Sequence, residues 1–145
     1  MKLKSKDFVD NGNIPSEFTC DGRNISPQLS WEDVPDNTKS FALAVTDPDA
    51  LGGTWIHWIV SGISNELRTI DRASLPEGAE EIKNDFGRTR YGGPCPPSGT
   101  HRYFFVIYAL DTEHLEGLNK RNFFEKIQKH TLEKAEIKGL YKRRR

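Results

Sequence analysis

The sequence predicts a mainly β protein, a sandwich of two antiparallel sheets with one or two peripheral helices. Three apolar runs, at residues 41–46, 54–60 and 101–110, alternate as strands do. Only one later segment, residues 119–130, has clear helical spacing, so most strands follow one another without an intervening helix. Such a chain favours antiparallel pairing of distant strands, as in a two-sheet sandwich.

Length and composition narrow the class of protein. The 145 residues fit one domain, which we expect to span residues 1–145. The 21 basic and 21 acidic residues cancel, so no global charge suggests a nucleic-acid partner or an anionic membrane. No apolar signal region and no stretch near the roughly 20 apolar residues of a membrane span is present. We therefore expect a cytoplasmic protein.

The first half of the chain supplies loops and two strands. The first 39 residues are rich in turn-forming residues and predict loops with short strands, one of them at residues 29–31. The run 41–46 is apolar on both alternating faces, which predicts a strand covered on both sides. In the run 54–60, alternation places His57 on the face opposite to Trp58, flanked by core residues.

The second half supplies a long loop, a central strand, the helix and a closing strand. We expect an edge strand near Leu67 to Ile70 and a mixed-charge loop from Pro76 to Arg90. The Gly- and Pro-rich residues 92–99 predict a stiff loop that leads into the strand at His101. Asn119 is expected to cap a helix that runs to about His130. Residues 134–141 alternate, which favours a strand over a continued helix.

Four polar side chains lie at or next to the ends of apolar strands: Asp47, Asp49, His57 and His101. Carboxylates and imidazoles are costly beside apolar surface unless a partner or ligand compensates them. These groups could bind zinc or iron, perform acid and base catalysis on an ester, or recognise a phosphate together with backbone N–H groups. Composition alone does not choose between these three chemistries.

Structural roles are open for several of the neighbouring residues. Arg102 is expected to pair with an aspartate and hold a loop. Tyr103 shares a face with His101, so its hydroxyl either edges the same cleft or belongs to a core ring. His114 and His130 lack such a context and are expected at the surface.

Cys20 and Cys95 both lie in turn-rich loops. A structural bridge, a buried free thiol and a reactive thiol are all open, and the free thiol is the default for a cytosolic protein unless its source is a hyperthermophile. Three X-Pro bonds in residues 93–97, and the bond between Asp47 and Pro48, are candidates for a cis peptide that shapes a pocket.

Four ordered motifs carry a resemblance to a known family. They are TCDGRNISPQLSW from Thr19, DPDA from Asp47, WIHW around His57 and GGPCPPSGTHRYFF from Gly92. Together they resemble the conserved blocks of the phosphatidylethanolamine-binding, or Raf kinase inhibitor-like, proteins, specifically the short bacterial and archaeal branch. The resemblance extends over most of the chain.

The resemblance implies a Greek-key β sandwich with a small surface pocket for phosphate-like anions. The residues that match the pocket of the family are Asp47, His57, His101 and Tyr103, with Asp49 and Pro94 at its rim. It implies no cofactor, no metal ligand and no catalytic residue. Longer eukaryotic members end in a helix that contributes a tyrosine to the pocket, whereas this chain ends in an expected strand, so Tyr141 is not given that role.

We therefore expect a non-enzymatic binding module for a phosphoryl, lipid-headgroup or carboxylate anion, in which Asp47 orients His57 or His101. Inhibition of a protein kinase or a serine protease is implied by resemblance only, and a homodimer is left open. The alternative is a phosphoester hydrolase or a metal-dependent enzyme that uses the same Asp and His cluster. Ser61 and Ser98 lack the flanking glycines of a nucleophile elbow, which weakens the hydrolase alternative.

Overall fold

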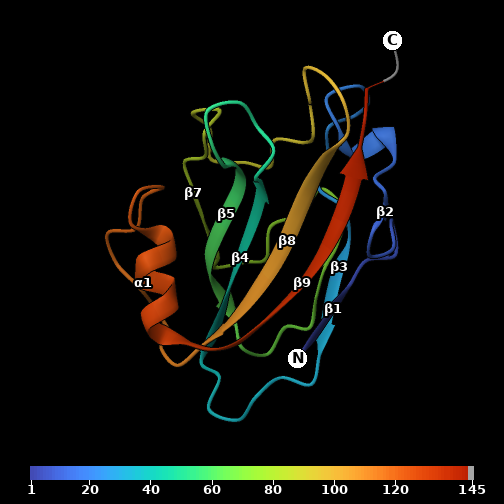
Figure 1. The fold of residues 1–145 in the computed structure, drawn as a ribbon. Coiled ribbons are helices and arrows are strands. Elements are labelled where there is room, and N and C mark those ends of the chain that lie inside the picture. The colour runs from blue at the N-terminus through green and yellow to red at the C-terminus, as the bar shows by residue number, and fades with distance from the viewer. Residues whose placement is uncertain (144–145) are drawn as a thin grey trace.

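The computed structural model describes residues 1–143 and contains two β-sheets (Figure 1). In this part of the chain the larger sheet has the strand order β2-β9-β8-β4-β5-β7 and the smaller sheet the order β1-β3-β6. The larger sheet consists of β2 (Gly12–Asn13), β4 (Ser40–Asp47), β5 (Trp55–Ser64), β7 (Glu80–Ile82), β8 (His101–Leu110) and β9 (Thr131–Tyr141). The smaller sheet consists of β1 (Lys2–Lys4), β3 (Leu29–Glu32) and β6 (Thr69–Ile70).

The strand order of the larger sheet is that of a Greek key. Strands β4, β5 and β7 are consecutive neighbours, and β8 then returns to pair with β4 on its other side. Within residues 1–143, all strand pairings are antiparallel except a two-residue parallel contact between β2 and β9, in which Gly12 lies opposite Gly139. The predicted mainly β, two-sheet fold is confirmed, and the short parallel pair corrects the expectation of purely antiparallel sheets.

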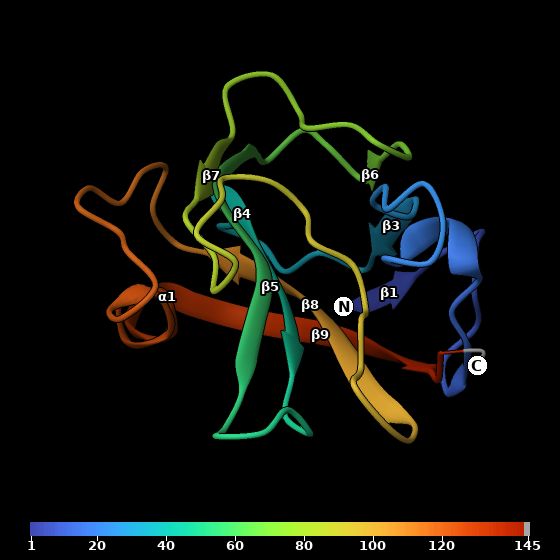
Figure 2. The same ribbon diagram turned by 90° about the horizontal axis from the view of Figure 1, so that it is seen from above.

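The helix and the smaller sheet cover opposite faces of the larger sheet (Figure 2). One face packs against Leu3, Leu29 and Trp31 of the smaller sheet and forms the main core. The other face packs against the helix α1 (Phe123–His130), whose Phe123 and Ile127 are fully buried over the alanines of β4. Small side chains on this face of β4 let the helix approach closely, and the expectation that this strand is covered on both sides is confirmed.

The start of α1 differs from the prediction. The helix begins at Phe123 rather than directly after Asn119. The Asn119 backbone N–H donates to Asn122 Oδ1, and the Asn122 N–H donates to Asn119 Oδ1, at 2.8 and 3.0 Å. These reciprocal bonds form a capping box around the turn 119–122, and the Phe123 N–H donates to the Asn119 carbonyl oxygen at 2.9 Å. Asn119 therefore caps the helical turn as expected, although the regular helix begins at Phe123.

Strand β5 contains a β-bulge that decides where His57 points. Val45 lies opposite Trp58 and Thr46 opposite Ile56, so His57 has no partner residue on β4. His57 consequently contacts Tyr103 on the same face of the sheet where Trp58 enters the main core. The predicted strict alternation, with His57 opposite to Trp58, is therefore wrong.

Other expectations on secondary structure are partly met. The closing strand is confirmed as β9, and the 3-10 helix η1 (Ser16–Phe18) lies within the irregular N-terminal region. The loop predicted from Pro76 to Arg90 contains β7, which extends the larger sheet by pairing with β5. The X-Pro bonds within residues 1–143 are all trans, so the expected cis candidates are wrong. Within these residues, no helix combines the length and apolarity needed to cross a membrane.

Candidate functional site

The ends of three neighbouring strands bring the predicted residues together. Asp47 is the last residue of β4, His57 lies near the start of β5, and His101 is the first residue of β8, with Tyr103 following on the same face. Because these strands are antiparallel neighbours, the three ends meet at one end of the larger sheet (Figure 1). All four side chains line a pocket of about 230 Å³, which we call the anion pocket.

Asp47 orients His101 within the anion pocket. The Asp47 Oδ2 atom lies 2.7 Å from His101 Nδ1, and both side chains are almost completely buried. A carboxylate only accepts hydrogen bonds here, so Nδ1 carries the hydrogen and the opposite ring nitrogen, Nε2, is the one left for a ligand. The second carboxylate oxygen of Asp47 accepts the backbone N–H of Asp49 at 2.8 Å. Of the two histidines that Asp47 was expected to orient, the structure selects His101.

His57 is held by a backbone carbonyl instead. Its Nδ1 lies 2.7 Å from the carbonyl oxygen of Gly92, which can only accept, so Nδ1 carries the hydrogen. Burial lowers the pKa of His57, and the hydrogen bond to Gly92 and the charge of Asp47 only partly oppose this effect. His57 is therefore neutral at neutral pH, with a lone pair on Nε2. Its ring packs edge-on against Tyr103 and Phe86, with centroid distances of 5.3 and 5.2 Å.

Tyr103 contributes a buried hydroxyl without a hydrogen-bond partner in residues 1–143. Its side chain is 0% exposed, and its ring stacks on that of His101 with an interplanar angle of 23°. Burial raises the pKa of Tyr103, and the nearby negative charge of Asp47 raises it further. The hydroxyl thus stays protonated at ordinary pH and makes no hydrogen bond of regular geometry, although the Asp47 carboxylate and the backbone N–H of Cys95 lie near enough to influence its pKa. A bound anion can therefore offer this donor a better acceptor.

Asp49 does not line the anion pocket, because Arg102 occupies its carboxylate. The backbone N–H and Nε of Arg102 donate to Asp49 Oδ2 at 2.9 and 3.0 Å, and Nη2 donates to Oδ1 at 2.8 Å. The Arg102 guanidinium lowers the pKa of Asp49 to about 2. The expected pairing of Arg102 with an aspartate is confirmed, and Asp49 is not among the residues that line the pocket.

Pro94 is also displaced from its expected position. Its carbonyl oxygen accepts the backbone N–H of Cys20 at 3.1 Å, and the ring does not line the anion pocket. The next residues of the same loop, Cys95, Pro96 and Pro97, form that wall instead. The loop was therefore identified correctly from its sequence, but the contacting residues lie one to three positions further along.

Cys20 and Cys95 form a disulfide with a Cα–Cα distance of 5.4 Å, so the default expectation of a free thiol is wrong. Two backbone contacts bring the loops together: the bond between Cys20 and Pro94, and a bond from the Gly93 N–H to Asn24 Oδ1 at 2.8 Å. A Cβ atom at Gly93 would lie 2.3 Å from the backbone oxygen of Phe18. Only glycine allows this close approach, which makes the bridge geometrically possible.

Asn84 is a residue of the site that sequence reasoning missed. It is buried, and its Nδ2 donates to the backbone oxygens of His57 and Arg90 at 2.9 and 2.8 Å. Its Oδ1 accepts the backbone N–H groups of Phe86 and Arg88 at 2.9 and 3.1 Å. Asn84 therefore fixes the loop 84–90 on β5 and sets the Phe86 ring against His57. The turn sequence Asn-Asp-Phe-Gly was the available signal.

Apolar side chains form the rest of the anion pocket. Trp55 and Phe86 pack edge-on at 5.6 Å and are both partly exposed at the mouth, and Ala50 and Leu51 complete the wall. The pocket is thus a small apolar cup with polar groups only at its base. The low polarity of these walls strengthens the electrostatic interactions that the buried groups at the base make.

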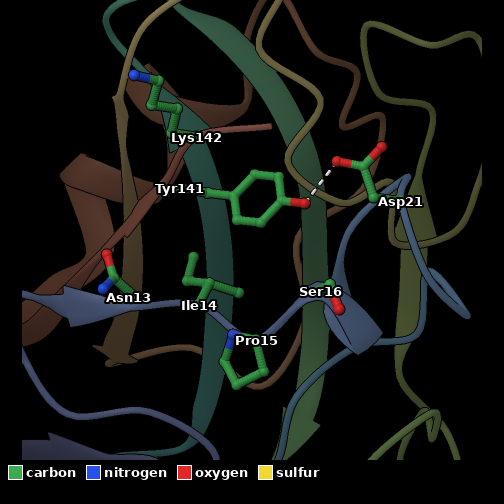
Figure 3. A pocket seen from close by; sticks show the side chains of 7 residues that line it. All are labelled: Asn13, Ile14, Pro15, Ser16, Asp21, Tyr141 and Lys142. Carbon is green, nitrogen blue, oxygen red and sulfur yellow. Dashed lines mark hydrogen bonds between the residues drawn. The ribbon is translucent and has the colours of Figure 1, made fainter. Parts of the chain in front are cut away.

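A larger cavity of about 680 Å³ lies elsewhere on the molecule (Figure 3). It is lined by Asn13, Ile14, Pro15, Ser16, Asp21, Tyr141 and Lys142. The Tyr141 hydroxyl donates to Asp21 Oδ2 (Figure 3), and Arg143 pairs with the other oxygen at 3.0 Å. We call this the Asp21 cavity. The expectation that Tyr141 takes no part in the anion pocket is confirmed.

The two histidines outside the anion pocket, His114 and His130, lie at the surface of the described structure. His114 is exposed, and the half-exposed His130 bonds Asp111 at 2.8 Å, as expected for surface residues. Among residues 1–143, no group of three or more His, Cys, Asp or Glu side chains is arranged to hold a metal ion.

Comparison with known proteins places this geometry in a family. The sequence model described as phosphatidylethanolamine-binding protein matches residues 4–142. A UPF0098 protein of Methanothermobacter thermautotrophicus is 47% identical, with 99% of each chain covered. The UPF0098 protein YbhB of Escherichia coli is 37% identical over 97% of this chain and 99% of its own. The crystal structure of Escherichia coli YbcL, described as a new member of the mammalian PEBP family, superposes with a TM-score of 0.94 at 32% identity, covering 99% of this chain and 98% of YbcL.

Proposed function

This chain belongs to the phosphatidylethanolamine-binding protein family, and we propose that it is a non-enzymatic binding module whose anion pocket holds a phosphoryl or carboxylate group. The observation that carries the proposal is the Tyr103 hydroxyl, a buried donor that makes no hydrogen bond of regular geometry within residues 1–143, beside two histidine rings that each keep one nitrogen for a ligand. An anion that enters the pocket can accept a hydrogen bond from the Tyr103 hydroxyl, and this bond contributes to the binding free energy.

The two histidines play different roles in this proposal. At His101, Asp47 occupies Nδ1, so Nε2 is the ring nitrogen available to a bound anion. At His57, the neutral ring accepts a hydrogen bond from a protonated phosphoryl oxygen through Nε2. The pocket therefore suits a phosphoryl group that keeps one proton better than a fully ionised one.

The size of the anion pocket limits the ligand. A volume of about 230 Å³ is below the roughly 300–1,000 Å³ typical of sites for drug-sized ligands. The pocket accommodates a phosphoryl group with a small substituent, such as a lipid headgroup, while a longer attached group extends past Trp55 and Phe86 at the mouth. A role in inhibiting a protein kinase or a serine protease is proposed on family resemblance alone.

Binding is favoured over hydrolysis by the residues that line the pocket. Covalent catalysis needs an activated nucleophile beside the base. The lining includes no serine or threonine, and its one cysteine, Cys95, is bonded to Cys20. Of the other polar side chains, the Asp47 carboxylate is bonded by His101 and by the Asp49 N–H, and the Tyr103 hydroxyl stays protonated, so only the two imidazoles could act as nucleophiles. The Asp47–His101 pair is therefore interpreted as an orienting pair for ligand binding.

The proposal is tested by titrating the protein with inorganic phosphate and O-phosphoethanolamine while recording the NMR signals of the histidine rings. We expect His57 and His101 to shift together, and His57→Ala and His101→Ala to weaken binding about tenfold or more. His130→Ala is the matched control, because His130 bonds Asp111 in a similar but half-exposed pair.

Two results would overturn the proposal. Phosphate binding that survives His57→Ala unchanged would place the ligand elsewhere. Stoichiometric zinc or iron in the purified protein, or steady release of phosphate from a phosphomonoester that depends on His101, would support the alternative of a metal-dependent enzyme or a hydrolase.

A further inference from the structure

A second hollow adjoins the anion pocket on the other side of Phe86. It has a volume of about 270 Å³ and shares Phe86 and Cys95 with the anion pocket. Its cationic wall is formed by Arg88 and Arg90, and no acidic residue lines it. We call it the arginine groove.

The two arginines of the groove differ from most others in this protein. Arg23, Arg72, Arg102 and Arg143 pair with carboxylates. Within residues 1–143, the guanidinium groups of Arg88 and Arg90 have neither an ion-pair nor a hydrogen-bond partner. Two unneutralised cations beside a hollow without acids create a local positive potential in a chain of zero formal net charge.

Asn84 fixes the backbone of Arg88 and Arg90, and it also fixes the backbone of His57 in the anion pocket. Asn84 accepts the Arg88 N–H, donates from its own N–H to the Arg88 oxygen at 2.9 Å, and donates from Nδ2 to the Arg90 oxygen. The same Nδ2 also donates to the backbone oxygen of His57. Asn84 therefore holds the arginine groove and the anion pocket in a fixed position relative to each other. This reduces the entropic cost when one ligand binds to both.

The floor of the groove is equally constrained. The Tyr91 hydroxyl donates to the backbone oxygen of Phe18 at 2.7 Å, and Gly93 bonds Asn24. The disulfide between Cys20 and Cys95 closes this floor. Two exposed guanidinium groups that line a hollow with so constrained a backbone are suited to bidentate binding of a phosphoryl or carboxylate group.

We propose that the arginine groove is a second anion subsite, so that the ligand preferred by this protein carries one anionic group in the anion pocket and another beyond Phe86. This inference rests on the proposed function of the anion pocket. The chemistry is that of two acidic groups on one short linker. A small doubly phosphorylated molecule and a phosphorylated peptide with an acidic residue nearby both offer it.

The test uses α,ω-alkane bisphosphonates with linkers of about two to eight methylene groups, each compared with the alkyl monophosphonate of the same length, by calorimetry. We expect one linker length to bind about tenfold tighter than its monophosphonate, and this gain to shrink as salt is added. The double variant Arg88→Gln/Arg90→Gln should lose the gain and keep the affinity for the monophosphonate. Arg121→Gln, at an exposed arginine that lines a different hollow, is the matched control.

The outcomes separate the two proposals. A monophosphonate that binds at His57 and His101, together with bisphosphonates that gain nothing at any length, overturns the subsite alone. A gain that persists in the double variant also overturns it. If the monophosphonate does not bind the wild-type protein, the anion pocket and the subsite that depends on it both fail.

A second comparison distinguishes the source of the ligand. A phosphotyrosine peptide with a glutamate one to three residues away is titrated beside the same peptide with glutamine. If the wild-type protein binds the glutamine peptide more weakly than the glutamate peptide, and Arg88→Gln/Arg90→Gln binds the two equally, the subsite is assigned to peptides. Equal affinities, with the bisphosphonate gain intact, assign it to small doubly acidic molecules.

Discussion

The anion pocket and the Asp21 cavity each contain a buried or partly buried aspartate and a tyrosine, but they use them differently. In the Asp21 cavity, Tyr141 donates to Asp21, which also receives Arg143. In the anion pocket, Asp47 is bonded by His101, and the Tyr103 hydroxyl has no partner in the part of the chain that the structure describes. The tyrosine and the aspartate of the larger cavity are therefore bonded to each other and to Arg143, whereas the tyrosine of the smaller one makes no hydrogen bond of regular geometry. What distinguishes the candidate binding site is a buried donor without a regular hydrogen bond that lies in a pocket beside a buried Asp–His pair. Trp31 Nε1, a second such donor among residues 1–143, lies in the main core instead.

The largest effect is expected from the disulfide, which joins the two regions because Cys20 precedes Asp21 and Cys95 lines the anion pocket. The double variant Cys20→Ala/Cys95→Ala should lose about 4 kcal/mol of unfolding free energy, since the bridge closes a loop over 75 residues of sequence. Urea unfolding measures the loss. Phosphate affinity should fall as well, because the pocket wall at residues 95–97 is loosened. An unchanged affinity would show that the wall is held without the bridge.

The two aspartates provide the next comparison. Asp47→Ala removes the acceptor of the buried His101 and should cost about 3 kcal/mol of unfolding free energy. Asp21→Ala, at a side chain that is 25% exposed, should cost about 1 kcal/mol. Chemical denaturation measures both, and only Asp47→Ala should weaken phosphate binding. A greater loss for Asp21→Ala would reverse the assignment of the more tightly integrated site.

The two tyrosines should respond with opposite signs. Tyr103→Phe removes a hydroxyl that makes no hydrogen bond, so the unfolding free energy should stay the same or rise by about 1 kcal/mol. Tyr141→Phe removes the hydrogen bond to Asp21 and should lower it by about 1 kcal/mol. Phosphate affinity should fall for Tyr103→Phe and stay constant for Tyr141→Phe. A Tyr103→Phe protein that binds phosphate normally would remove the observation on which the proposed function depends.

The smallest effect concerns pH. Because burial lowers the pKa of His57 below the ordinary histidine value of 6.5, the unfolded state binds more protons than the folded state between these two pKa values. His57 therefore makes stability fall as pH decreases below 6.5 and has no effect on the slope well above it. Urea unfolding between pH 5 and 7.5 should show a steeper dependence for the wild-type protein than for His57→Gln. Identical slopes would mean that His57 titrates normally.

Several residues of the candidate site could be predicted from local patterns in the sequence. The alternation of residues 101–110 placed His101 and Tyr103 on one face, and both line the anion pocket. Side chains two residues apart on a regular strand share a face whatever the rest of the fold does. The Gly- and Pro-rich loop was recognised as a wall of the site, although its contacts begin at Cys95 rather than Pro94.

Other parts of the site depend on contacts that no local pattern encodes. The bulge in β5 reverses the side to which His57 points, because strand β4 offers it no partner residue. Phe86 enters the pocket only because Asn84 bonds the loop to the backbone of His57. Arg102 takes Asp49 away from the rim, and this depends on the approach of residues 53 positions apart.

The sequence by itself determined which chemical groups lie at the strand ends, the family to which they belong, and the glycine that permits the loops to meet. Only the tertiary structure decided which partners these groups take: Asp47 with His101, His57 with Gly92, and Tyr103 with none among residues 1–143. The physical reason is that alternation and turn chemistry act over a few residues. Hydrogen-bond partners are set by strand order, which joins Asp47 to His101 across 54 residues.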